Sequence, residues 1–156
     1  MKPKRSRSSL TKRPDRTVKT QSINIESRTE RLIAVREFVS GAARDFGFSD
    51  EEISKIALAV DEACTNVIKH AYRFDPTKKI TITVKRQNGA FEVAISDTGE
   101  KFNPSGLQQP DMKEYLSHYR RGGLGVYLMK SLMDKVEYDI KPGKKNMVRL
   151  IKYLSR

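Results

Sequence analysis

The sequence predicts an α+β fold, in which helices cover one face of a mixed, mainly antiparallel sheet to make a two-layer sandwich. Some segments alternate apolar and polar residues as strands do, and others repeat apolar residues at helical spacing. The predicted order is β-α-α-β-β-loop-α-β-β, which lacks the regular alternation of a doubly wound parallel sheet. The length of 156 residues suits a single domain with a sizeable core.

The first three elements are a strand and two helices. The strand is predicted over residues 19–26, where polar and apolar residues alternate. A helix follows within residues 27–48, and a second helix is predicted over residues 49–72. The second helix opens with Ser49 and Glu52, the S-x-x-E pattern of a capping box, and carries one apolar stripe over about five turns.

A β-hairpin is predicted next. Residues 78–87 and 90–97 form two alternating runs. Asn88 and Gly89 between them are a strong signal for a two-residue hairpin turn.

Residues 98–121 show no long periodic pattern, apart from a short helix predicted around residues 112–119. A connection of this length inside a compact domain is usually functional, such as a lid or a binding loop. A Gly-rich turn, an apolar helix and a strand are predicted within residues 120–140, and the last strand over residues 146–154.

The positive charge is concentrated at the N-terminus. The formal net charge is +12, and residues 1–20 hold eight Lys/Arg against one Asp. This segment contributes +7 and leaves +5 for the other 136 residues. We therefore expect a basic, disordered tail over residues 1–19 and a folded domain over residues 20–156. Such a tail can attract nucleic acid, anionic lipid or an acidic protein, or can serve solubility alone.

A cytoplasmic protein is expected from three absences in the sequence. It has no apolar run long enough to cross a bilayer and no apolar segment typical of a secretory signal. Its single cysteine, Cys64, cannot form an internal disulfide.

One helix face carries a carboxylate and a carboxamide. In the stretch VDEACTNVIKHAY, Glu62 and Asn66 are four residues apart, so they lie one above the other, off the apolar stripe. A solvated helix face commonly carries such a pair. The small neighbours Ala63, Thr65 and Ala71 leave room above the helix, which favours a binding site as the second interpretation.

A carboxylate also closes a predicted strand. Asp97 ends the run AFEVAISD and is followed by Thr98 and Gly99. An acceptor beside a glycine that lets the backbone approach a ligand suits a flat group that donates hydrogen bonds. The alternative is an ordinary D-x-G turn.

A Gly-rich turn opens the late apolar helix. Gly122, Gly123 and Gly125 put free N–H groups and the positive helix end beside Arg120 and Arg121, an arrangement that favours a phosphate. The G-K-[ST] ending of a P-loop is absent, and the turn lies too late in the chain for a Rossmann fingerprint. An ordinary Gly-rich turn is the alternative.

The order of these three motifs resembles the N, G1 and G2 boxes of the GHKL (Bergerat-fold) ATPase superfamily. The stretches DEACTNVIKHAY and GGLGVYLMKSLMDKVEY are similar to the small bacterial anti-sigma-factor serine/threonine protein kinases of that superfamily. The resemblance covers about residues 20–155. It implies the Bergerat ATP-binding fold, with ATP and Mg²⁺ as cofactors.

The resemblance also implies roles for the helix pair and the strand end. Asn66 would ligate the Mg²⁺ that bridges the ATP phosphates, a role that suits an amide oxygen. Glu62 would be the general base that takes the proton of a serine hydroxyl or a water. Asp97 would accept a hydrogen bond from the adenine amino group, and Gly99 would make space beneath the ring.

The Gly-rich turn would meet the phosphates. By the same resemblance, Gly123, Leu124 and Gly125 would close over them as part of a lid. Arg121 would meet the γ-phosphate and take part in catalysis. In phosphoryl transfer, positioning and charge neutralisation provide most of the rate enhancement.

Two features depart from the family pattern. Many members carry a Gly-Thr pair near the last strand, whose Thr helps to hold adenine through water, whereas this chain has KKNMV there. Either Asn146 substitutes for that Thr or the contact is missing. The basic tail is also outside the pattern.

The resemblance implies an ATP-dependent anti-sigma regulatory factor. It would bind a sigma factor and phosphorylate an anti-anti-sigma (STAS-type) protein on Ser or Thr, and it would form a homodimer through the first strand and helix. The alternative is an ATP-gated binding module that sequesters a regulator without kinase activity. A third hypothesis, nucleic-acid binding through the tail, has no helix-turn-helix or RNA-binding motif in the body to support it.

Overall fold

Five strands form one sheet, and every neighbouring pair in it is antiparallel. The computed structural model describes residues 18–99, 124–141 and 143–155. The strands lie in the order β1-β2-β3-β5-β4. Their bounds are β1 Lys19–Glu26, β2 Lys79–Gln87, β3 Ala90–Asp97, β4 Lys135–Lys141 and β5 Lys145–Tyr153.

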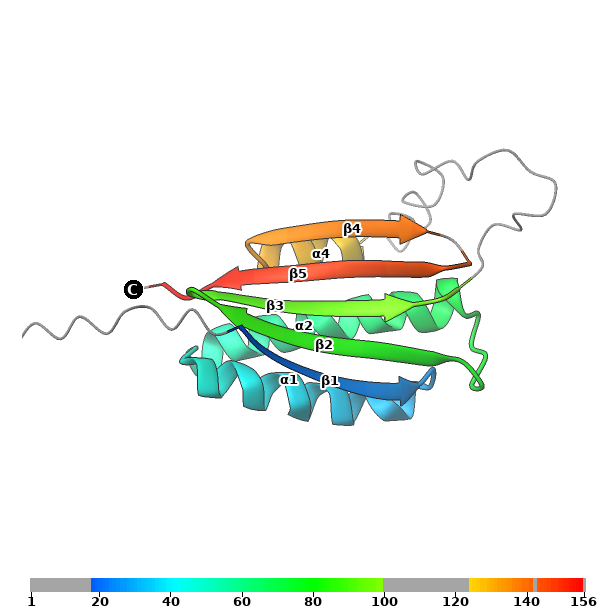
Figure 1. The fold of residues 1–156 in the computed structure, drawn as a ribbon, viewed down its shortest axis with the longest axis horizontal. Coiled ribbons are helices and arrows are strands. Elements are labelled where there is room, and N and C mark those ends of the chain that lie inside the picture. The colour runs from blue at the N-terminus through cyan, green and yellow to red at the C-terminus, as the bar shows by residue number, and fades with distance from the viewer. Residues whose placement is uncertain (1–17, 100–123, 142, 156) are drawn as a thin grey trace, which may run out of the picture.

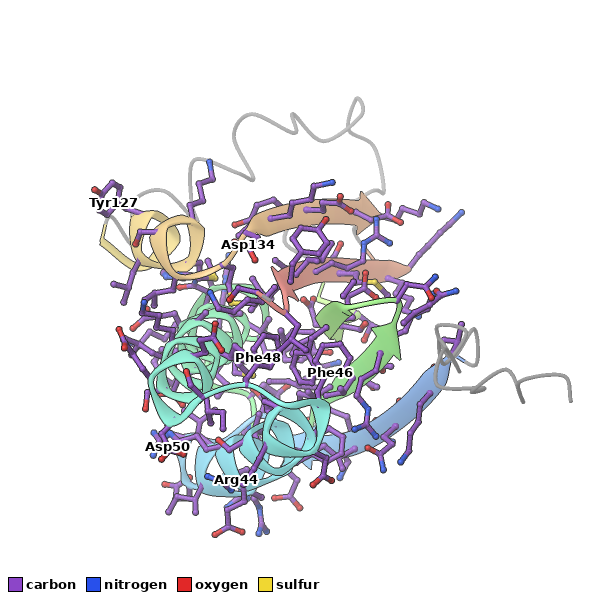
Figure 2. All side chains as sticks on the ribbon, turned by 90° about the vertical axis from the view of Figure 1, so that its left-hand side faces the viewer. Arg44, Phe46, Phe48, Asp50, Tyr127 and Asp134 are labelled. Atoms are coloured by element: carbon purple, nitrogen blue, oxygen red, sulfur yellow. The ribbon has the colours of Figure 1, made fainter. Side chains whose placement is uncertain are left out.

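Three α-helices lie on one face of this sheet (Figures 1 and 2). They are α1 (Leu32–Phe46), α2 (Asp50–Asn66) and α4 (Leu124–Leu132), with a short 3₁₀ turn η1 (Thr29–Arg31) and a π-helix η2 (Val67–Ala71). The predicted α+β two-layer sandwich and its element order are therefore confirmed. The basic tail, most of the loop after β3 and the helix expected around residues 112–119 lie outside the described residues.

The hairpin between β2 and β3 has the turn that the sequence predicts. Asn88 and Gly89 have φ values of 50° and 76°, the positive pair that a type I′ turn requires. The turn fixes which side chains of each strand face the helices. Alternate side chains of β3, namely Phe91, Val93 and Ile95, are buried on that face.

Both helix signals in the first half are confirmed. α1 ends at Gly47, which has a left-handed φ of 110°. At the start of α2, the Glu52 N–H donates to Ser49 Oγ (3.2 Å) and the Ser49 N–H donates to Glu52 Oε2 (3.1 Å). This reciprocal pair is the capping box, and it satisfies two backbone donors that the helix leaves without partners.

An ion pair joins α1 to α2. The Arg36 guanidinium donates to both carboxylate oxygens of Asp61, at 3.0 and 3.1 Å. The hydrogen bond to Asp61 raises the pKa of Arg36 above its usual value. The pair therefore holds α1 against α2 one residue before Glu62, although its exposure to solvent limits its contribution to stability.

The core fills the space between the helices and the sheet. Phe46, Phe48 and Phe91 form an aromatic cluster with ring centroids 5.4 to 5.6 Å apart, and Figure 2 places Phe46 and Phe48 between the two layers. The opposite face of the sheet carries no helix in the described part of the chain (Figure 1). No helix of the described residues has the length and apolar character needed to cross a membrane.

The second helix differs from the prediction at its end. The α-helix stops at Asn66, and residues 67–71 continue as a π-helix, in which the Tyr72 N–H donates to Val67 O at 2.9 Å. A π-helical turn spans i to i+5 and is common at functional sites. The wider turn changes the direction in which the side chains after Asn66 point.

We predict that replacing Glu52 with Gln makes stability less dependent on pH. The hydrogen bond from the Ser49 backbone lowers the pKa of Glu52 below its usual 4.5. Its stabilising contribution is thus complete above that value and is lost as the pH falls through the lowered pKa. Urea unfolding should show a loss of about 0.5 kcal/mol for Glu52→Gln at pH 7 and a smaller loss at pH 3.

Glu51→Gln is the matched control, because Glu51 also lies in the first turn but makes no capping hydrogen bond and is paired with Lys55 at 3.5 Å. If Glu52→Gln lowered the free energy of unfolding equally at pH 7 and pH 3, the ionised carboxylate of Glu52 would not be what stabilises the helix start.

Candidate functional site

A buried polar cluster lies where β3 ends and β5 begins. Asp97 is the last residue of β3, and the register sets it opposite Asn146 of β5. Asp97 Oδ1 accepts hydrogen bonds from Asn146 Nδ2 (2.9 Å) and from the Gly99 N–H (2.8 Å). Asn146 Nδ2 also donates to Gly99 O at 3.0 Å. Asp97, Gly99 and Asn146 are therefore joined in one hydrogen-bond network.

Gly99 lies against the end of the π-helix. A Cβ at this position would be 2.8 Å from Ala71 O and 3.0 Å from both Ala71 Cβ and Asp97 Oδ1. The 2.8 Å distance to Ala71 O is shorter than a Cβ tolerates, and this oxygen belongs to the backbone, which cannot rotate away. The D-x-G motif is thus a place where only glycine allows the strand end and the helix end to approach each other.

Tyr72 ties the same helix end to two strands. Its hydroxyl donates to Lys79 O (2.7 Å) at the start of β2 and accepts from the Thr98 N–H (2.8 Å) just after β3. Sequence reasoning did not select Tyr72. The available signal was a tyrosine at the end of an apolar helix, because a buried tyrosine hydroxyl normally finds a hydrogen-bond partner.

Glu62 and Asn66 lie at the C-terminal part of α2, one turn apart. Glu62 is half-buried, whereas Asn66 is only 6% exposed. Asn66 is buried although it was expected off the apolar stripe, because α1, α4 and the sheet pack around α2 and cover more than that stripe. Asn66 Nδ2 finds no hydrogen-bond partner among the described residues. A buried amide donor without a partner is costly, so Asn66 is a candidate for contact with a ligand.

The Gly-rich motif is described only from Leu124 onward. As predicted, a helix begins at this turn: Leu124 and Gly125 are the first two residues of α4, which packs against α2. Gly123 and Arg121 lie outside the described residues. In the first turn of α4, Tyr127 is 71% exposed and points away from the sheet (Figure 2).

Cys64 does not belong to this site. Its side chain is fully buried, and burial raises the pKa of the thiol to about 12. The thiolate, which is the reactive form, is therefore absent at neutral pH. Within the described ranges, no group of three or more His, Cys, Asp or Glu side chains is placed to hold a metal ion.

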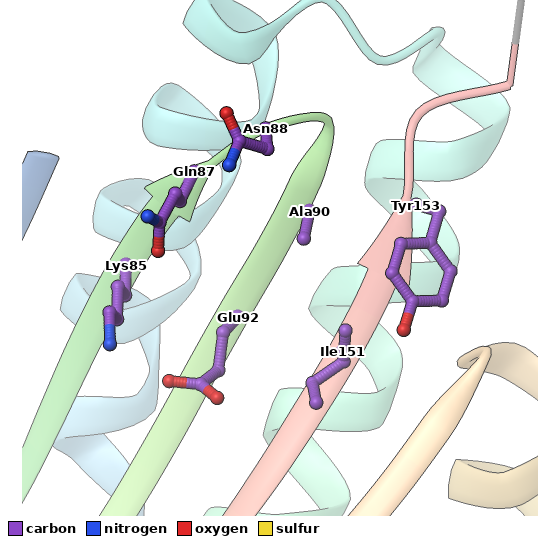
Figure 3. Close-up of a pocket in the computed structure, with 7 residues that line it drawn as sticks. All are labelled: Lys85, Gln87, Asn88, Ala90, Glu92, Ile151 and Tyr153. Carbon is purple, nitrogen blue, oxygen red and sulfur yellow. The ribbon is translucent and has the colours of Figure 1, made fainter. Parts of the chain in front are cut away.

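The described residues line two hollows, of which one adjoins the polar cluster. A cavity of about 10 Å³ touches Asp97 and Asn146, and Val67, Ile95, Tyr138, Ile140, Met147 and Val148 complete its lining. A depression of about 350 Å³ lies instead on the sheet face that points away from the helices (Figure 3). Its lining is Lys85, Gln87, Asn88, Ala90, Glu92, Ile151 and Tyr153. The exposed depression holds none of the predicted site residues, so the candidate site is the buried cluster at the strand ends.

The geometry suits a nucleotide. A carboxylate held by backbone and amide donors lies at the strand end, a glycine removes the side chain beside it, and a helix supplies a carboxylate and an amide one turn apart. An acceptor of this kind recognises a donor on a flat base, and hard oxygen ligands hold a divalent cation on phosphates. The fold and the site together define a nucleotide-binding domain of the GHKL class.

Comparison with known proteins identifies the family. Residues 25–152 match the family model described as a histidine kinase-like ATPase domain, and the chain belongs to that family. It is 33% identical to the serine-protein kinase RsbW of Bacillus subtilis (strain 168) over 138 residues, which is 85% of this chain and 84% of that protein. It is 32% identical to the RsbW of Bacillus licheniformis over 134 residues, 83% of this chain and 82% of that protein.

Two solved structures share the fold. One contains the RsbU and RsbW domains of Rv1364c from Mycobacterium tuberculosis, with a TM-score of 0.63 and 16% identity over 88% of this chain and 33% of that one. The other is the SiaB-SiaC complex from Pseudomonas aeruginosa, with a TM-score of 0.63 and 13% identity over 84% of this chain and 88% of that one. The predicted membership of the GHKL superfamily is confirmed, and the relatives above 30% identity confirm the class of protein serine kinase.

We predict that Gly99→Ala destabilises the domain and Gly41→Ala does not. A methyl group at residue 99 would meet the backbone at Ala71, and overpacking of this kind costs about 1 to 3 kcal/mol. Gly41 lies inside α1 with nothing within 4 Å of an added Cβ, so alanine there should stabilise by about 0.5 to 1 kcal/mol. Urea unfolding of both variants tests the pair. If Gly99→Ala were as well tolerated as Gly41→Ala, the close approach would not constrain the motif.

Proposed function

We propose that this chain is an ATP- and Mg²⁺-dependent anti-sigma regulatory factor with protein serine/threonine kinase activity. It binds a sigma factor and phosphorylates an anti-anti-sigma (STAS-type) protein. The observation that carries the proposal is the buried amide of Asn66, one turn after Glu62 on α2, within a chain that belongs to a histidine kinase-like ATPase family.

The strand-end cluster would recognise the base. In this proposal, Asp97 accepts a hydrogen bond from the adenine amino group, and the missing side chain at Gly99 leaves space beneath the ring. The support is geometric for Asp97, because two donors fix Oδ1 of its carboxylate. The place of a Cβ on Gly99 is filled by Ala71, so packing alone accounts for glycine there. A rotationally fixed acceptor loses little conformational entropy on binding.

Asn66 is the residue that fits the metal. Its side chain is buried one turn after Glu62, and the carbonyl oxygen of its amide is the atom that would ligate the ion. An amide oxygen is a ligand that Mg²⁺ accepts, usually together with phosphate oxygens and waters. When bound, Mg²⁺ neutralises charge on the phosphates. Gly123, Leu124 and Gly125 would cover the phosphates, and Arg121 would contact the γ-phosphate.

The chemical step is transfer of the γ-phosphoryl group to a hydroxyl. The serine oxygen attacks the γ-phosphorus, the bond to the β,γ-bridging oxygen breaks, and ADP leaves. Glu62 takes the proton of the serine hydroxyl, so that ATP and protein serine give ADP and phosphoserine. The half-buried position of Glu62 leaves its carboxylate accessible to a protein substrate.

Several wider assignments belong to the same proposal. Residues 20–156 form the kinase domain, and residues 1–19 form a basic tail outside it. The protein is cytoplasmic and a homodimer, and any contact with nucleic acid would use the tail. These assignments follow from the family and the charge distribution.

We predict that Glu62→Gln abolishes phosphoryl transfer and leaves ATP binding intact, because it removes the base and keeps the shape of the side chain. The assay supplies labelled ATP and a candidate anti-anti-sigma protein, and calorimetry follows ATP binding. A loss of at least about 100-fold in transfer is expected, the lower end of what a general base contributes.

Glu51→Gln on the same helix is the matched control, since Glu51 is exposed in the first turn of α2. Unchanged transfer by Glu62→Gln would remove that residue from the mechanism. Absence of transfer in the parent protein, with ATP still bound, would favour the ATP-gated binding module.

We predict that Asn66→Ala removes the magnesium-dependent part of ATP binding. Calorimetric titration of ATP with and without Mg²⁺ should show a difference in the parent and none in the variant. Asn24→Ala, on the exposed side of β1, should behave as the parent does. An equal magnesium effect in parent and Asn66→Ala would exclude Asn66 as the ligand.

A further inference from the structure

We propose that Asn146 is a positioning residue for base recognition, acting through Asp97 and Gly99. This inference rests on the proposed function, in which Asp97 receives the base. It assigns a role to the direct hydrogen bond that the Asn146 amide donates to Asp97. Asn146 does not contact the base in this proposal; it fixes the group that does.

The amide nitrogen of Asn146 serves two acceptors at once. Nδ2 carries two hydrogens, and it lies 2.9 Å from Asp97 Oδ1 and 3.0 Å from Gly99 O. The reverse orientation of the amide would place an oxygen against both acceptors, so the hydrogen-bond network defines the orientation. A threonine hydroxyl has a single hydrogen and could serve only one of them.

The two hydrogen bonds lock the strand end that carries the D-x-G motif. Asp97 Oδ1 also accepts from the Gly99 N–H at 2.8 Å, so this one carboxylate oxygen accepts two hydrogen bonds. Gly99 is in turn held through its carbonyl by Asn146. Asn146 thus contacts both the carboxylate and the glycine beside it, and the Gly143 N–H adds a donor to Gly99 O at 3.4 Å.

Burial makes these contacts effective. Asn146 is 2% exposed and Asp97 4% exposed, so water does not compete for the hydrogen bonds. Tyr138 is the other titratable residue that lines the adjoining cavity, and the rest of the lining is Val, Ile and Met. Asn146 Oδ1 has no partner among the described residues, and the cavity of about 10 Å³ is close to the size that one water needs.

The test uses three variants that differ in donors and charge. Asn146→Asp keeps the shape but replaces the donor with a carboxyl group beside Asp97. Two adjacent carboxylates do not both ionise readily, so one proton stays between them at low pH and is lost as the pH rises. Asn146→Thr supplies one donor in place of two. Asn24→Asp makes the same charge change on the exposed face of β1, where Asn24 Oδ1 accepts from Thr81 Oγ1.

The measurement is the affinity for ATP by calorimetry between pH 5.5 and 8.5, expressed relative to the parent protein at each pH. Asn146→Asp should bind within about threefold of the parent at pH 5.5 and at least about tenfold more weakly at pH 8.5, since a lost charged hydrogen bond is worth this much. Asn146→Thr should lose about two- to fivefold at every pH. Asn24→Asp should match the parent throughout.

The outcomes separate this inference from the proposed function. A parent protein that does not bind ATP would overturn both. If the parent binds ATP and Asp97→Asn weakens binding, but Asn146→Asp follows the parent at every pH, then Asn146 does not position Asp97. A merely structural role predicts a loss that is independent of pH in both Asn146 variants, and this result would also overturn the inference. If Asn146→Asp does not fold, Asn146→Thr decides, and parental affinity in that variant is the overturning result.

Discussion

The antiparallel pairing of β3 with β5 is the constraint on which the rest of the site depends. It sets Asp97 opposite Asn146 although 49 residues separate them in the chain. The alternation that buries Phe91 and Leu150 against the helices turns Asp97 and Asn146 to the same side. The alternation of side chains that buries the core residues therefore also places Asp97 and Asn146 side by side, at the point where the apolar part of each strand stops.

The second requirement is that the helix end and the strand end approach closely. Gly99 permits the approach at Ala71, and the Tyr72 hydroxyl fixes it by bonding the backbones of Lys79 and Thr98. Both contacts are made at the end of the π-helix that follows Asn66. Three kinds of interaction thus meet at one end of the sandwich. They are the β3–β5 pairing, the close packing of Gly99 on Ala71 and the hydrogen bonds of the Tyr72 hydroxyl. In the described part of the chain, no helix packs on the opposite face of the sheet, so no such set of contacts forms there.

The fold and much of the site follow from local sequence rules. Periodicity predicts the strands and helices, Asn88-Gly89 predicts the hairpin, and Ser49 with Glu52 predicts the helix start. Each of these features depends on residues that are neighbours in the chain. The π-helix, the burial of Asn66 and the hydroxyl bridge of Tyr72 depend on elements packed against α2, which no local pattern contains. The direct bond between Asn146 and Asp97 likewise required the β3–β5 register.

The wide separation of Asp97 and Asn146 along the chain affects when the site comes into existence. A chain still leaving the ribosome already holds α2, the hairpin and Asp97, yet it lacks the strand that provides Asn146. Closing so long a loop costs entropy that only the completed sheet offsets. This end of the sandwich is therefore among the last parts to form during synthesis. A cleavage between β3 and β5 would leave Asp97 and Asn146 on separate fragments.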